Sequence, residues 1–146
     1  MKNILVPLEL ADDKIDQRLI SAAIDLALPF EAKCWIIHIA PPNPEFVGYE
    51  VGPQYIRDEL AEEYRDEHRK IQLYTEQVKA KTLSSEGLMI QGATAEMIET
   101  EIEKLKIDLV ILGNRKYSFL EVLFKGSLKD ELIESLKIPI FLVPIS

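Results

Sequence analysis

Two segments in the C-terminal part of the chain carry the residue types and the spacing of a phosphate site. Residues 109–113 form an apolar run that ends in glycine, which predicts a buried strand reaching the edge of its sheet. Gly126 and Ser127 directly precede a helical pattern over 128–136, so we expect them at a helix N-terminus. Unpaired backbone N–H groups and the helix dipole favour anions at such an end. The chemistry predicted for these segments is phosphate binding.

Strand and helix patterns alternate along the whole chain. Short apolar runs predict five strands, at 3–6, 33–40, 88–91, 107–112 and 140–143. Helical spacing of apolar residues predicts four helices, at 15–26, 55–83, 94–105 with Thr94 as the N-cap, and 128–136. The strands are apolar on both faces. The sequence therefore predicts an α/β fold, a five-stranded parallel sheet that is doubly wound and Rossmann-like, in a single domain spanning 1–146.

The predicted fold places the phosphate site at one end of the sheet. In doubly wound sheets ligands bind beyond the carboxyl ends of the strands, at the point where the winding reverses. If the first and fourth strands are neighbours there, Pro7, Leu8 and Glu9 meet Gly113 and the Gly126-Ser127 pair. The sequence thus predicts one site built from both halves of the chain.

Composition limits the classes of partner. The 146 residues carry a net charge of −8 and a pI near 4.8, which disfavours a nucleic-acid or anionic-membrane surface. No apolar run approaches the roughly 20 residues of a membrane span, and no signal-peptide pattern starts the chain, so we expect a cytoplasmic protein. Cys34 is the only cysteine and lies in an apolar run, where we expect a buried small hydrophobe rather than a redox thiol.

The remaining polar candidates favour structural roles over catalysis. His38 lies in an apolar strand and is expected to be a satisfied core or strand-end histidine rather than a base. His68 stands among charged residues on a predicted helix, which favours a solvated face, and Asp12-Asp13 favours a cap of the first helix over a metal site. No spacing of His and Cys suits a protein metal site, and no residue pair predicts a catalytic centre.

The chain resembles the universal stress protein family from end to end. Val6-Pro7-Leu8-Glu9 resembles the VPxD sequence that ends the family's first strand, and His38-Ile39 resembles the HV-like pair that often ends its second. The segment Gly92-Ala93-Thr94-Ala95-Glu96-Met97-Ile98 resembles the turn before the acidic DLIVMG-like strand, which corresponds here to 108–113. The resemblance implies the adenine nucleotide alpha hydrolase-like version of the doubly wound fold.

ATP-binding members of that family carry GxxGx9G followed by Ser or Thr. The corresponding residues here are Gly113, Lys116, Gly126 and Ser127, so the spacing is kept and a lysine replaces the second glycine. The resemblance implies that Gly126 and Ser127 hold the phosphates at the helix start. It implies a nucleotide site made of Pro7, Leu8, Glu9, Ile39, Gly113, Asn114, Arg115, Lys116, Gly126, Ser127 and Leu128.

Two departures from the family pattern leave alternatives open. A Cβ at Lys116 either crowds the ligand or strains the loop, at a cost of about 1–2 kcal/mol if φ must be positive, whereas its ammonium group attracts phosphate. Glu9 stands at the family's Asp position, where its extra methylene either preserves the ribose contact or pushes the sugar outward.

The function expected from the resemblance is binding of an adenine nucleotide, ATP or AMP, with any Mg²⁺ carried by the nucleotide, in a regulatory or stress-response module. The alternative is a dimeric interaction protein of the same type that has lost the nucleotide, and a slow ATPase ranks third. We expect a homodimer through the apolar terminal segment 138–145, because an exposed apolar edge strand favours pairing with its own copy.

Overall fold

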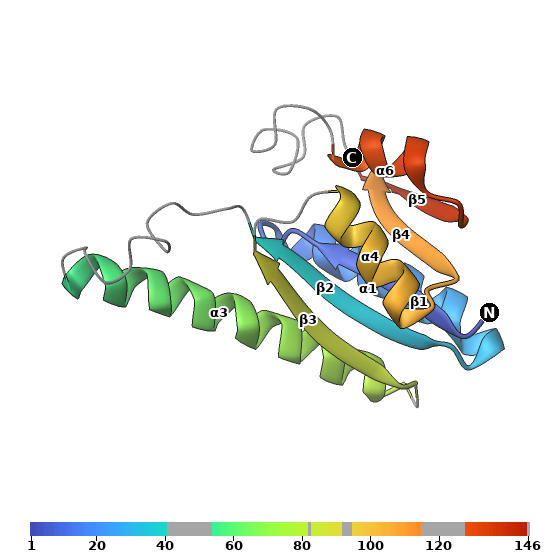
Figure 1. The fold of residues 1–146 in the computed structure, drawn as a ribbon. Helices are drawn as coiled ribbons and strands as arrows, with labels where there is room; N and C mark the ends of the chain where they lie inside the picture. The colour runs from blue at the N-terminus through green and yellow to red at the C-terminus, as the bar shows by residue number, and fades with distance from the viewer. Residues whose placement is uncertain (41–53, 82, 92–94, 115–127, 146) are drawn as a thin grey trace.

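The chain folds into a parallel sheet between two layers of helices. The computed structural model describes residues 1–40, 54–81, 83–91, 95–114 and 128–145 (Figure 1). The five strands are all parallel in the order β3-β2-β1-β4-β5, so the predicted fold class is confirmed. The elements are β1 (Asn3–Leu8), α1 (Asp13–Ala27), the 3₁₀ turn η1 (Leu28–Phe30), β2 (Lys33–Ala40), α3 (Gln54–Lys79), β3 (Ser85–Gln91), α4 (Ala95–Leu105), β4 (Leu109–Asn114), α6 (Leu128–Ser135) and β5 (Ile140–Pro144).

Strand boundaries differ from the prediction in four strands, and β5 differs only by its last residue, Pro144. β1 continues beyond 3–6 to Leu8, because Pro7 sits in register opposite Ile37 of β2 rather than ending the strand. β3 begins at Ser85 instead of residue 88, since its polar first residues pair in register with β2 at the edge of the sheet. β4 covers Leu109–Asn114 rather than 107–112, and the 3₁₀ turn η1 was not predicted.

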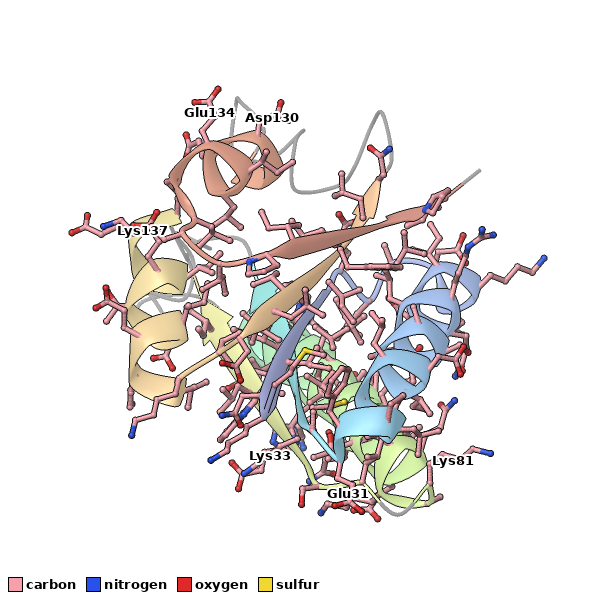
Figure 2. All side chains as sticks on the ribbon, turned by 90° about the vertical axis from the view of Figure 1, so that its right-hand side faces the viewer. Glu31, Lys33, Lys81, Asp130, Glu134 and Lys137 are labelled. Carbon is pink, nitrogen blue, oxygen red and sulfur yellow. The ribbon has the colours of Figure 1, made fainter. Side chains whose placement is uncertain are left out.

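Alternate residues of the strands pack into two separate hydrophobic cores, one on each face of the sheet. Ile4, Val6 and Leu8 of β1 pack with α1 and α3 on one face of the sheet. Leu5 faces the opposite side, where it packs with α4 and α6. Figure 2 shows side chains filling the space between the sheet and the helices, whereas charged groups such as Glu134 and Lys137 project from the periphery. Both faces of the sheet are therefore covered, as its apolar strands require.

Two helices begin near the carboxyl end of the sheet, where the site is predicted. Asp12 is the N-cap of α1, and its side chain accepts a 2.9 Å hydrogen bond from the N–H of Lys14, so the predicted cap is confirmed for Asp12. Figure 1 shows that α3 begins beyond the carboxyl ends of β2 and β3 and then runs back along the sheet.

Among the described helices, none is both long and apolar enough to cross a membrane.

Side-chain hydrogen bonds close the amino end of the sheet. Asp108 Oδ2 accepts from the backbone N–H groups of Lys2 at 2.8 Å and Asn3 at 3.0 Å. Asn3 in turn donates to the Lys106 carbonyl at 3.2 Å and accepts from Trp35 Nε1 at 3.1 Å. These bonds tie β1 to the strands on both sides, which fixes the register that continues toward the carboxyl end.

Candidate functional site

The carboxyl edge between β1 and β4 is the point where the winding reverses. From β1 the chain passes to β2 and β3 on one side, then crosses to β4 and β5 on the other, so the predicted pairing of the first and fourth strands is confirmed. The β1–β2 ladder joins six residue pairs. The β1–β4 ladder joins only Ile4 with Leu109 and Leu5 with Val110. The two central strands therefore stop pairing well before their carboxyl ends, where such sheets bind ligands.

Pro7 gives a physical reason for this early end of the ladder. Lys33 N–H bonds to the Lys2 carbonyl and Asp108 N–H bonds to the Asn3 carbonyl, so alternate residues of β1 face β2 and β4. By that alternation Pro7 falls on the β4 side. Proline has no N–H to donate, so the β1–β4 ladder cannot continue through this position.

The structure brings several of the predicted site residues to this edge. Pro7 and Leu8 are buried at the end of β1, and Glu9 follows them with partial exposure. Ile39 lies in β2 next to the last residue of that strand. Three further residues stand at the ends of their elements: Gly113 and Asn114 close β4, and Leu128 starts α6. The predicted residues Arg115, Lys116, Gly126 and Ser127, like the predicted cap Thr94, lie outside the described residues.

Gly113 lies where two other segments approach the end of β4. A Cβ at this position would collide with Cδ1 of Ile145 and lie 3.8 Å from Cδ1 of Leu19. The segment after β5 and helix α1 thus meet over the end of β4. Because Cδ1 is the flexible end of the Ile145 side chain, this contact alone does not require glycine at position 113.

His38 ties the end of β1 to α3. It is 3% exposed, and its Nδ1 donates to the Leu8 carbonyl at 2.9 Å, since a carbonyl can only accept. Its Nε2 lies 3.1 Å from Oε2 of Glu67 on α3, at ion-pair distance but outside hydrogen-bond geometry. The prediction of a core or strand-end histidine is confirmed, but only its Nδ1 is satisfied by a hydrogen bond, since the buried Nε2 makes none. The contact with Glu67 was not predicted.

A buried polar cluster behind the β1–α1 turn was also missed. Asp16 is 1% exposed, and its carboxylate accepts from the Tyr74 hydroxyl at 3.1 Å and lies near the backbone N–H of Leu10, which lowers its pKa. The Tyr74 hydroxyl lies 3.3 Å from Oδ1 of Asp13, and Lys70 Nζ lies 4.0 Å from that same oxygen. Asp13 therefore faces α3 rather than capping α1.

Burial sets the protonation of this cluster. It raises the pKa of Asp16 above 3.8, against the lowering effect of the hydrogen bond from Tyr74. Burial and the neighbouring Asp16 also raise the pKa of Tyr74, so the phenol stays a donor. The sequence did contain a signal, because Asp16 falls at helical spacing with the buried Ile20, Ala23 and Ala27.

Cys34 and His68 lie in the environments that the sequence predicts for them. Cys34 is fully buried in β2, as predicted, and burial raises its pKa to about 11. His68 is exposed on α3, which confirms the prediction of a solvated helical face. Within the described segments, no group of three or more His, Cys, Asp or Glu could hold a metal ion.

Comparison with known proteins agrees with the fold and identifies the family. The model of the universal stress protein family matches residues 1–144. Universal stress protein MJ0531 of Methanocaldococcus jannaschii is 27% identical over 144 residues, which cover 97% of this chain and 81% of the relative.

Two solved structures share the fold. A universal stress protein in complex with cAMP superposes with a TM-score of 0.68 at 16% identity, over 99% of this chain and 98% of that one. The universal stress protein of Archaeoglobus fulgidus in complex with dAMP gives a TM-score of 0.64 at 12% identity, over 97% of both chains. Because the family model matches nearly the whole of this chain, the chain belongs to the universal stress protein family.

Proposed function

We propose that this universal stress protein binds an adenine nucleotide, ATP or AMP, at the carboxyl edge between β1 and β4, and that occupancy regulates its conformation or its partners. The observation that carries the proposal is the early end of the β1–β4 ladder at the switch point of the sheet. Related proteins of the same fold have been solved with cAMP and dAMP, which supports an adenosine monophosphate as ligand.

The proposal gives each part of the edge a role. The Glu9 carboxylate binds the ribose hydroxyls, and the backbone of Ile39 faces adenine. The phosphates are held by backbone N–H groups after β4 and at the start of α6, where helix geometry favours anions. The phosphate and ribose side comprises Gly113, Asn114, Arg115, Lys116, Gly126, Ser127 and Leu128. Any Mg²⁺ arrives with the nucleotide, and no residue is assigned a catalytic role.

Titration calorimetry of the whole chain with AMP and with ATP tests this function. We expect saturable binding of at least one nucleotide, and weaker binding after Glu9→Gln, which removes the charge and keeps the size. Loss of a hydrogen bond to a charged group costs about 1.5–3 kcal/mol, or roughly 10- to 100-fold in Kd. Glu31→Gln, at the opposite end of the sheet, is the matched control and leaves Kd unchanged (Figure 2). Absence of heat with both nucleotides at millimolar concentration refutes the proposal.

A second candidate function is a dimeric interaction protein without a nucleotide. The observation that favours it is the terminal edge strand β5, where Phe141 and Leu142 are 42% and 41% exposed. Apolar side chains of this size on an edge strand favour pairing with a second copy. Retained dimerisation without nucleotide binding would select this alternative, and binding by the wild type selects the first.

A further inference from the structure

Leu10, the second residue after β1, adopts a backbone conformation that leucine avoids. Its φ is 62°, in the left-handed region, where a Cβ crowds the carbonyl oxygen. The side chain is 6% exposed and packs in the core shared by α1 and α3. Such a conformation persists only where surrounding contacts enforce it. The turn directly after Glu9 is therefore held in place by its neighbours.

Both backbone groups of Leu10 lie against charged side chains. Its carbonyl accepts from Lys70 Nζ at 3.3 Å, and its N–H lies near the buried Asp16 carboxylate, whose pKa it lowers. Tyr74 fixes Asp16 in turn, through the 3.1 Å bond from its hydroxyl. Lys70 and Tyr74 are both residues of α3, so this helix holds the turn directly at the Leu10 carbonyl and, through Asp16, beside the Leu10 N–H.

The residue on the other side of Glu9 is fixed as well. The Leu8 carbonyl accepts from His38 Nδ1 at 2.9 Å, and Nε2 of the same ring faces Glu67 of α3 at 3.1 Å. The carbonyls on both sides of Glu9 are thus connected to α3, one through His38 and one through Lys70. Pro7 leaves this stretch of β1 without ladder bonds to β4, so these contacts restrain it in their place.

We infer that Lys70 and Tyr74 of α3 are positioning residues for the nucleotide site, because they set the turn from Leu8 to Leu10 that presents Glu9. The inference rests on the proposed function. It has a reciprocal consequence, since coupling between two equilibria acts equally in both directions. Nucleotide binding then stabilises the docking of α3 against the sheet.

Affinity for AMP in variants of α3 tests the inference. Tyr74→Phe removes only the hydroxyl, and Lys70→Met removes the ammonium group from a side chain that is 43% exposed. If the turn then reaches its competent geometry one-tenth of the time, the apparent Kd rises about tenfold. Lys70→Arg keeps a donor for the Leu10 carbonyl and restores binding. The control is Gln77→Met, which removes the hydrogen bonds to Gln17 on the same helix pair and leaves Kd unchanged.

A second readout separates positioning from a general structural role. All titrations are run at a temperature where circular dichroism shows each variant folded, so a loss of stability alone does not move Kd. Hydrogen exchange of the α3 amides is expected to slow on adding AMP to the wild type, and to slow less in Lys70→Met. If the wild type binds AMP and all variants bind equally, the inference is overturned and the proposed function stands. If the wild type does not bind, both are overturned.

Discussion

The contact between α3 and the edge strand β3 depends on a glycine. A Cβ at Gly87 would collide with Cγ2 of Ile71 and lie 3.0 Å from Oγ1 of Thr75. Both neighbours are β-branched residues of α3, so their χ1 torsions are restricted, and Ile71 is only 2% exposed. Ile71 has one strongly preferred χ1 rotamer in a helix, and the Thr75 hydroxyl donates to the Ile71 carbonyl at 2.7 Å, so Gly87→Ala pushes the helix off the strand. Overpacking costs about 1–3 kcal/mol, and replacing glycine in a strand returns about 0.5–1 kcal/mol. These ranges give a net cost of about 0–2.5 kcal/mol, and the collision with the buried Ile71 favours the upper half of that range, about 1–2 kcal/mol.

Urea unfolding followed by the fluorescence of Trp35, the only tryptophan, measures this change. Gly113→Ala is the matched control, because its Cβ meets Cδ1 of Ile145, the flexible end of a side chain near the terminus. That end can move, so the control is expected to cost less than about 1 kcal/mol. Ile71→Leu removes Cγ2 at constant volume. Combined with Gly87→Ala, it should show a favourable coupling of at least about 0.5 kcal/mol.

Two results would refute this account of the α3–β3 contact. The first is Gly87→Ala unfolding at the same urea concentration as the wild type. The second is an additive double mutant with Ile71→Leu, which would mean that Cγ2 is not the atom in the way. Either result would show that α3 sits on β3 with more freedom than the close approach at Gly87 indicates.

Three further predictions concern single residues. Backbone N–H bonds from Lys2 and Asn3 lower the pKa of Asp108 below 3.8, so its contribution to stability is complete above that pH and is lost as the pH falls through the lowered value. The stability difference between wild type and Asp108→Asn, measured by urea unfolding, should therefore shrink in acid. Leu142→Lys should convert a dimer to a monomer in sedimentation velocity, and a monomeric wild type would contradict the edge-strand dimer. Cys34, with its pKa raised to about 11, should be alkylated by iodoacetamide only in urea.

Hydrophobic patterning predicted the elements best where both faces of a strand are buried. The β2 range 33–40 was predicted in full because the run is apolar on both faces of a central strand. The start of β3 was missed because Ser85, Glu86 and Gly87 have low strand propensity. They are strand residues through register with β2 and contact with α3, and neither is visible in local sequence. The same tertiary effect carries β1 through Pro7.

Sequence reasoning predicted the location of the candidate site but not the contacts behind it. Its location followed from a topological rule, since alternating strands and helices imply a switch point and the first and fourth strands meet there. The contacts behind it did not follow, because they join residues far apart in the chain. Asp16 and Tyr74 are 58 positions apart, and nothing in either helix alone indicates that their polar atoms meet. The lone acidic residue on the apolar face of α1 was the available signal.

The end of β1 is paired with β2 on one side and is not paired with β4 on the other. This difference determines which side can adjust when a ligand binds. On the β2 side, the ladder continues to Leu8 and His38 adds a side-chain bond to its carbonyl. On the β4 side, pairing stops at Leu5, two residues before Pro7. Because the restraints on β1 come from β2 and α3, a ligand bound at the proposed site between β1 and β4 would meet a strand that is held fixed on its β2 side. Any adjustment on binding should therefore occur on the β4 side, where no ladder bond has to be broken.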